Sequence, residues 1–322
     1  MTNIKVCVTG AAGQIGYSII PHILSGETFG RDVSIDLNLL DIEPAMDVLF
    51  GVVMEIEDCA FPLLKKVTAT SNVEEAFDGI DVAILIGALP RRAGMQRSDL
   101  LKANVQIFKD QGIALNKVAK KTCKVLVVGN PVNTNAFVLG KYAPSIPREN
   151  ISCLMKLDEN RATAQVAIRL NVNVKDVRNV IVWGNHSTTQ YPDFSQATVG
   201  KEKVSTRISK EEEQEIRNLV QNRGAAIIKA RKLSSSMSAS RAISDHLNAW
   251  ICGSNEIISM GVWSNGEYGA PKDCVFSFPC KCSNGKWEIV RGIDMNKDAQ
   301  AAFQVTADEI RKEKEQALQY LE

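Results

Sequence analysis

Short, nearly continuous apolar runs alternate with helical spacing through the first half of the chain. The runs are rich in β-branched residues and lie at 5–9, 35–40, 67–70, 82–87 and 124–129. Parallel strands that are covered on both faces have this composition. Between the first two runs, Ile15, Ile19 and Ile23 recur every four residues, which is typical of an amphipathic helix. The pattern predicts a doubly wound, parallel α/β sheet of the Rossmann type.

The pattern changes after about residue 150. Four further apolar runs predict strands, at 152–157, 180–183, 274–278 and 287–290. A helical pattern starts at Asp158, and Ser283-Asn284-Gly285 between the last two runs is a hairpin signal. The chain ends in a charged segment with apolar residues three or four apart, which predicts a helix on the surface of the second domain. The second half is therefore predicted to be α+β with antiparallel strands.

Length and composition set the broad class. A chain of 322 residues with 45% hydrophobic content favours two packed domains, which we place at 1–154 and 155–322. A net charge of +1 gives no summed field that would attract nucleic acid or an anionic membrane. The eight cysteines show neither a zinc spacing nor a redox pair, so we expect reduced thiols and no metal.

The sequence also carries no targeting signal that we recognise. Residues 1–5 run directly into the first strand pattern, and the apolar runs are too short to cross a bilayer. A cytoplasmic location is the expectation that remains.

A glycine-rich turn follows the first predicted strand and opens the first predicted helix. Gly10-Ala11-Ala12-Gly13-Gln14-Ile15-Gly16 has the spacing GxxGxxG, so unhindered backbone N–H groups lie at a helix N-terminus, where a pyrophosphate could bind. The second strand ends at Asp41, whose carboxylate could accept both adenosine ribose hydroxyls and would repel the extra phosphate of NADP. These residues favour NAD. The alternative for Asp41 is an N-cap of the helix near Pro44.

Three histidines are available for acid–base chemistry. His22 and His246 lie in apolar helical patterns and are interpreted as structural. His186 lies in a turn after a strand, where catalytic groups of α/β proteins gather, although it could simply fill that turn. A proton-donating histidine benefits from a carboxylate at its second ring nitrogen, and Asp158 is the candidate. The alternative for Asp158 is an N-cap that pairs with Arg161 on the helix surface.

Arginines supply candidate carboxylate clamps. Arg161 has the planar fork that holds a carboxylate by two hydrogen bonds. Arg91, Arg92 and Arg97 lie on a glycine-containing loop after the fourth strand, which suggests a lid that closes on an anion. A solvated basic loop is the alternative, and we adopt it for Arg92 only, because a dianionic substrate needs more than one arginine.

Several segments together resemble the lactate/malate dehydrogenase family and, within it, the cytosolic malate dehydrogenases. They are Gly10 to Ser18, Leu39 to Ile42, Met54-Glu55, Asp58-Cys59-Ala60, the arginine loop, Val128 to Asn135, Leu157 to Ala162, and Val182 to Ser187. The resemblance implies reversible hydride transfer between malate or oxaloacetate and NAD, and a homodimer.

The resemblance also assigns roles residue by residue. Arg161 would bind the C1 carboxylate, Arg91 the C4 carboxylate, and Arg97 would polarise the carbonyl. His186 would move the proton with Asp158 orienting it, and Asn130 would hydrogen-bond the substrate. The cofactor residues implied are Gly10, Gly13, Gln14, Ile15, Gly16, Asp41, Asn104, Val128 and Asn130.

Two rival functions stay open from the sequence. A lactate dehydrogenase on this scaffold would leave Arg91 facing a methyl group, an unpaired guanidinium that costs on the order of 2–5 kcal/mol, or about 30- to several-thousand-fold in selectivity. A dinucleotide-binding module without catalysis would have no need of His186, Asp158 and Arg161.

Overall fold

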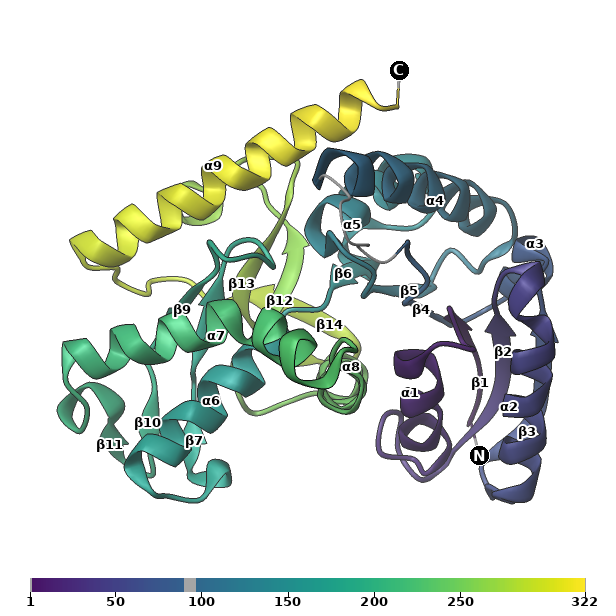
Figure 1. The fold of residues 1–322 in the computed structure, drawn as a ribbon, viewed down its shortest axis with the longest axis horizontal. Coiled ribbons are helices and arrows are strands. Elements are labelled where there is room, and N and C mark those ends of the chain that lie inside the picture. Colours follow the sequence, from purple (N-terminus) through teal and green to yellow (C-terminus); the bar gives the residue numbers. More distant parts are fainter. Residues whose placement is uncertain (1, 90–96, 322) are drawn as a thin grey trace.

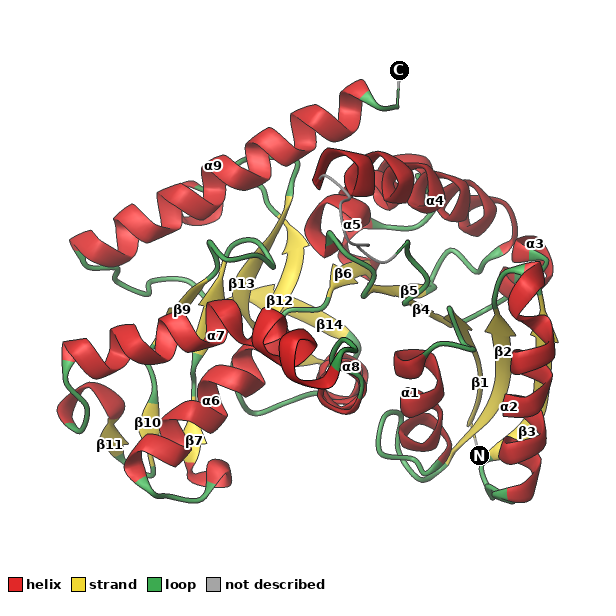
Figure 2. Ribbon diagram, viewed as in Figure 1, coloured by secondary structure: helices red, strands yellow, loops and turns green. Residues whose placement is uncertain are grey.

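The computed structural model describes residues 2–89 and 97–321. In the first half, strands and helices alternate (Figures 1 and 2). They are β1 (Thr2–Thr9), α1 (Gln14–Leu24), β2 (Val33–Leu40), α2 (Met46–Asp58), β3 (Leu64–Thr70), α3 (Val73–Phe77), β4 (Val82–Leu85), α4 (Arg97–Val118), β5 (Lys124–Val127), α5 (Val132–Tyr142) and β6 (Ile151–Cys153). These strands pair in parallel, in the order β3-β2-β1-β4-β5-β6, so the predicted doubly wound sheet is confirmed.

The second half is α+β, as predicted. Its elements are α6 (Lys156–Leu170), β7 (Val177–Arg178), β8 (Ile181–Trp183), β9 (Tyr191–Asp193), β10 (Thr198–Val199), β11 (Glu202–Lys203), α7 (Lys210–Arg231), α8 (Met237–Cys252), β12 (Ile258–Trp263), β13 (Val275–Ser283), β14 (Lys286–Ile289) and α9 (Lys297–Gln319). Short 3₁₀ turns occur at Glu43–Ala45, Arg148–Asn150, Val174–Asp176, Val204–Thr206 and Glu267–Gly269. The predicted hairpin joins β13 to β14, and Asn284 (φ 51°) and Gly285 (φ 71°) supply the positive φ values that its turn needs.

One sheet runs through both halves. β12, β13 and β14 add antiparallel strands beside β6 and complete a nine-stranded sheet. The junction is close, because a Cβ on Gly261 of β12 would lie 2.1 Å from the Sγ of Cys153 on β6. Glycine at this position therefore allows the two halves to share hydrogen bonds.

Two boundary predictions were wrong. The strand predicted at 152–157 ends at Cys153, and α6 already begins at Lys156. Leu154, Met155 and Leu157 are buried, so the start of a buried helix has the same apolar composition as a strand.

The C-terminal helix was predicted to pack on the surface of the second domain, and it also contacts the first half. Figure 1 shows that the C-terminal end of α9 reaches α4 and α5 of the first half. Ala317 accordingly belongs to the same apolar core as Phe137 of α5, and Thr134 of α5 donates a hydrogen bond of 2.9 Å to Glu313. The helix therefore connects both halves.

The cysteines are free thiols in the structure. All eight cysteines are free, and burial raises the pKa of several of them, for example that of Cys123 to about 12. Among the described residues, no helix is long and apolar enough to cross a membrane.

His246 is expected to make the folded chain sensitive to acid. Its ring is fully buried, with Nε2 3.2 Å from the Oγ of Ser152, and burial lowers its pKa to about 3. Below about pH 6.5, His246 binds a proton in the unfolded chain but stays neutral in the folded chain. The free energy of unfolding therefore falls by up to about 1.4 kcal/mol per pH unit as pH falls towards 3. Urea unfolding at pH 7 and pH 5 measures this slope.

The test variant is His246→Leu, which removes the buried imidazole and should flatten the slope. Equal slopes in the wild-type chain and in His246→Leu would exclude this source of acid sensitivity.

Candidate active site

The glycine-rich turn lies between the end of β1 and the start of α1. Gly10 (φ +65°) packs so closely that a Cβ would lie 2.8 Å from the Cα of Gly87, and a Cβ on Gly16 would lie 2.4 Å from the carbonyl oxygen of Gly10. A Cβ on Gly13 would meet only that same oxygen, at 3.2 Å, and Gly13 is exposed. Gly10 and Gly16 thus shape the turn, whereas Gly13 leaves its outer side open.

The N-terminus of α1 is free to receive an anion. Gly13 is the N-cap, no described side chain caps the helix, and its first turn holds no acidic residue. Gln14 is exposed, and Ile15 packs against the core. The N–H groups and the positive end of the helix dipole therefore face an open position, and the residues present fit a pyrophosphate.

Asp41 lies directly beside this turn. Its Oδ2 accepts a hydrogen bond of 2.8 Å from the backbone N–H of Ala12, and its Oδ1 accepts one of 2.8 Å from that of Ile42. The capping alternative does not hold, because Ile42 is the N-cap of the 3₁₀ turn at Glu43–Ala45. Each carboxylate oxygen keeps acceptor capacity for a ribose hydroxyl.

Asn104 holds backbone groups together. Its Oδ1 accepts from the N–H of Leu89 at 2.7 Å, and its Nδ2 donates to the carbonyls of Leu89 at 3.2 Å and Asn130 at 3.0 Å. The side chain is fully buried, so both amide protons have partners within the protein. Asn104 acts on the site through Leu89 and Asn130, whereas Asn130 itself is exposed and Val128 is buried beneath it.

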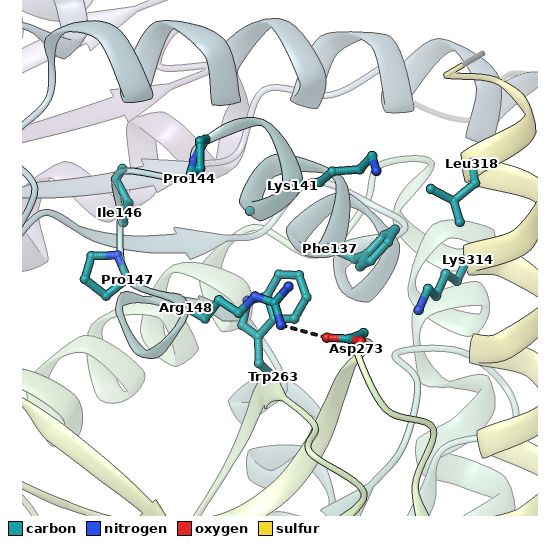
Figure 3. A pocket seen from close by; sticks show the side chains of 11 residues that line it. Phe137, Lys141, Pro144, Ile146, Pro147, Arg148, Trp263, Asp273, Lys314 and Leu318 are labelled. Carbon is teal, nitrogen blue, oxygen red and sulfur yellow. Dashed lines mark hydrogen bonds and ion pairs between the residues drawn. The ribbon is translucent and has the colours of Figure 1, made fainter.

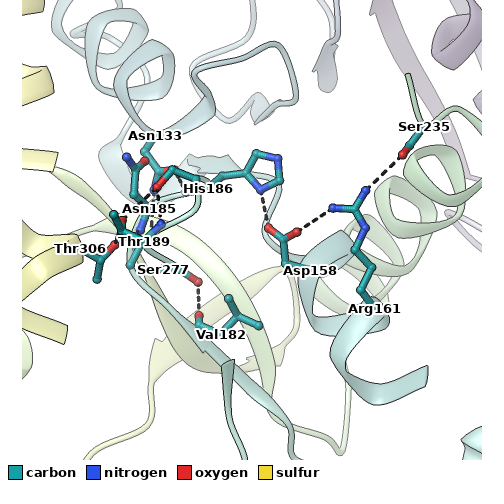
Figure 4. A network of polar contacts seen from close by, with 12 residues as sticks. Asn133, Asp158, Arg161, Val182, Asn185, His186, Thr189, Ser235, Ser277 and Thr306 are labelled. Atoms are coloured by element: carbon teal, nitrogen blue, oxygen red, sulfur yellow. Dashed lines mark hydrogen bonds and ion pairs between the residues drawn. The ribbon is translucent and has the colours of Figure 1, made fainter. Parts of the chain in front are cut away.

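His186, Asp158 and Arg161 come together as Figure 4 shows. Nδ1 of His186 contacts Oδ2 of Asp158, and Oδ1 of Asp158 accepts a hydrogen bond of 3.0 Å from Arg161 Nη1. Asp158 is completely buried, and burial alone would raise its pKa. The opposing effects of His186, of Arg161 and of a hydrogen bond from Gln190 are larger together and hold the pKa of the carboxyl below its usual value.

Arg161 keeps part of its guanidinium unused. Nη2 donates to Ser235 Oγ at 3.1 Å, and Nε, although buried, has no hydrogen-bond partner among the described residues. A buried donor without a partner costs free energy unless a ligand satisfies it. Arg161 therefore fits the carboxylate clamp predicted from the sequence, and Ser235 supports its guanidinium.

The sequence interpretation missed the groups that hold the histidine turn. Asn133 accepts from the N–H of His186 at 2.9 Å and donates to the carbonyls of Gly184 and Val275 at 3.3 and 3.1 Å. Thr306 and Glu309 of α9 bind the turn from the other side. Asn133 stands in the motif Val128 to Asn135, but nothing in the sequence places α9, about 120 residues away, beside the histidine.

Part of the arginine loop lies outside the described residues. This applies to Arg91 and Arg92, and also to the side chain of Arg97, which begins α4. The roles predicted for Arg91 and Arg97 stay predictions.

Two clefts lie outside the histidine site. One of about 400 Å³ adjoins the glycine turn, between α1 and α2. The other, of about 480 Å³, lies between α5 and α9, where Arg148 pairs with Asp273 at 2.7 Å (Figure 3). It contains none of the predicted site residues. The described side chains include no cluster that could hold a metal ion.

Comparison with known proteins identifies similar chains over the full length. Residues 4–152 match the NAD binding domain of lactate/malate dehydrogenase, and residues 155–321 match its alpha/beta C-terminal domain. The chain is 52% identical to probable malate dehydrogenase 3 of Dictyostelium discoideum and 54% identical to cytoplasmic malate dehydrogenase of Homo sapiens, over 99% of this chain and 98% of each relative. Lactate dehydrogenase of Trichomonas vaginalis, solved with NADH and oxamate, is 40% identical with a TM-score of 0.95 over 99% of both chains.

Proposed function

Because the chain belongs to the lactate/malate dehydrogenase family, we propose that it is an NAD-dependent malate dehydrogenase of the cytoplasmic type. The observation that carries the proposal is the buried Asp158 between His186 and Arg161, which joins a proton donor to a carboxylate clamp. A module that only binds a dinucleotide has no use for this arrangement.

When bound, NAD would accept the hydride and NADH would donate it. The glycine turn (Gly10, Gly13, Gln14, Ile15 and Gly16) receives the pyrophosphate at the N-terminus of α1, and Asp41 receives the ribose hydroxyls. Val128 and Asn130 would contact the cofactor, with Asn104 supporting the backbone of Asn130.

His186 moves the proton of the reaction. During oxaloacetate reduction, the imidazolium gives its Nε2 proton to the carbonyl oxygen as C2 accepts the hydride, and malate forms. During malate oxidation, the neutral imidazole takes the hydroxyl proton as the hydride leaves C2. Asp158 fixes the orientation of the ring through Nδ1 and stabilises the imidazolium form that gives the proton to the substrate oxygen.

Arginines bind the substrate. Arg161 holds the C1 carboxylate through its unused donors, and Asn130 donates a hydrogen bond to the substrate. Arg91 holds the C4 carboxylate and Arg97 polarises the carbonyl, both on the strength of the family resemblance.

The substrate and the cofactor are tested by following NADH absorbance with oxaloacetate and pyruvate in parallel, and again with NADPH. We expect a large preference for oxaloacetate and for NADH. Arg91→Leu should lower oxaloacetate turnover at least about 30-fold and leave NADH affinity nearly intact, because the distal carboxylate loses its charge partner.

Lactate dehydrogenase is the second candidate function. The 40% identity and TM-score of 0.95 to the Trichomonas vaginalis lactate dehydrogenase favour it. Preference for pyruvate in the wild-type chain would replace the malate assignment. An unchanged oxaloacetate rate in Arg91→Leu would remove Arg91 from the site.

A homodimer completes the proposal. Helix α2 buries Leu49, Val52 and Ile56, yet it also exposes Val48 (59%) and Met54 (63%), with the exposed Gly51 between them. An exposed apolar face of this kind suits packing against a second copy. Sedimentation velocity at micromolar concentration should give the mass of two chains, and a monomeric profile would contradict the proposal.

A further inference from the structure

The turn that carries His186 is held from the far side by helix α9. Glu309 Oε2 accepts a hydrogen bond of 2.9 Å from Asn185 Nδ2, one of 2.6 Å from Thr189 Oγ1, and a third from the hydroxyl of Ser187. Asn185 and Ser187 are the two neighbours of His186 in the chain. One carboxylate oxygen therefore collects donors from both sides of the histidine.

Thr306, one helical turn earlier, binds the same turn. Its Oγ1 accepts a hydrogen bond of 2.8 Å from the backbone N–H of Asn185 and lies 3.0 Å from Thr189 Oγ1. Thr306 is fully buried, and a Cβ on Gly184 (φ +95°) would lie 2.2 Å from its methyl carbon. The backbone of the turn is thus pressed directly against α9.

We propose that Glu309 is a positioning residue for His186, an inference that rests on the proposed dehydrogenase function. The imidazole of His186 contacts Asp158, and the backbone N–H of His186 donates to Asn133. Neither contact fixes the side chains of the neighbouring Asn185 and Ser187. Glu309 supplies that constraint. An ionised carboxylate oxygen makes stronger hydrogen bonds than the carbonyl oxygen of an amide, so glutamine at position 309 should hold the turn less firmly than glutamate does.

Glu309→Leu is the main test, assayed with oxaloacetate and NADH. A displacement of the imidazole by about 1 Å costs on the order of 100-fold in turnover, so we expect kcat to fall about 10- to 100-fold. Glu309→Gln keeps one acceptor oxygen, so its kcat should lie between those of the wild-type chain and Glu309→Leu. The affinity for NADH should change less than about twofold in both variants. Glu315→Gln, which removes an exposed charge from the same helix, is the matched control and should behave as the wild-type chain.

A second readout does not depend on activity. The chain has three histidines, so NMR resolves their ring signals, and a His186→Asn variant assigns the one that matters. In Glu309→Leu and Glu309→Gln, the His186 signal should broaden, split or move, whereas the signals of His22 and His246 stay in place. A simple loss of stability would not single out His186.

The outcomes separate this inference from the proposed function. An inactive wild-type chain would remove the dehydrogenase assignment, while the NMR spectra would still report whether Glu309 holds the turn. An active wild-type chain with unchanged kcat and unchanged His186 signals in Glu309→Gln and Glu309→Leu would overturn the inference. If Glu309→Leu fails to fold, Glu309→Gln alone decides by the same two measurements.

Discussion

Asp158→Asn is expected to lower kcat for oxaloacetate reduction about a thousandfold to ten-thousandfold, with little change in NADH affinity. The carboxylate is fully buried and is the group that contacts Nδ1 of His186. A neutral amide removes the charge that stabilises the imidazolium and allows the wrong tautomer of the ring, losses that reach this size in catalytic histidine pairs. Stopped-flow measurement of the hydride-transfer step, together with NADH titration, separates chemistry from binding.

Asp193→Asn is the matched control for that variant. Asp193 is also buried, but its carboxylate accepts from Trp183 Nε1 at 3.0 Å and from the N–H of Ser195 at 2.8 Å. This change should lower the melting temperature and leave kcat within a few-fold. Equal kinetic losses in the two variants would mean that Asp158 acts through stability and has no part in proton transfer.

Arg161→Gln is expected to lower kcat/KM for oxaloacetate by about 30- to several-thousand-fold. When the buried C1 carboxylate of the substrate loses its guanidinium partner, the cost is on the order of 2–5 kcal/mol. The same change removes an interaction that lowers the pKa of Asp158, so that pKa rises. Because the mechanism needs the charged carboxylate, activity should be lost at a higher pH than in the wild-type chain as pH falls, which a pH profile of kcat/KM measures.

The controls for Arg161 test charge and geometry separately. Arg161→Lys keeps the positive charge but not the planar fork, and it should recover only part of the activity. Arg169→Gln removes an arginine on the same helix that pairs with Glu212 and Glu215, and it should change neither parameter. A wild-type KM in Arg161→Gln would place the C1 carboxylate elsewhere.

The sequence predicted the first half of the fold well because its parallel strands are buried on both faces and therefore stand out as apolar runs. It failed at 152–157, since a buried helix start has the same composition as a strand. His186 was a strong candidate because only three histidines are present. Its contact with Asp158 depends on how α6 packs against the turn after β8, which no local spacing encodes.

Other site features depend on distant parts of the chain. The resemblance assigned Asn104 to the cofactor site, whereas its buried amide binds the backbone of Leu89 and Asn130, so its influence on a ligand is indirect. Glu309 had no signal at all, because one more acid in a charged amphipathic helix looks like a solvated side chain. Glu309 and Asn185 are 124 positions apart, and pattern and spacing do not reveal a contact of that kind.

The junction of β6 and β12 bears on how such chains are recombined. The two family regions meet at residues 152–155, yet β6 of the first region and β12 of the second are neighbours in a single hydrogen-bonded sheet. A fragment that ends there would expose the unpaired edge of β6 to solvent, and an unpaired strand edge can pair with other chains. A chimera built from two relatives would need Gly261 and Cys153 to be chosen together.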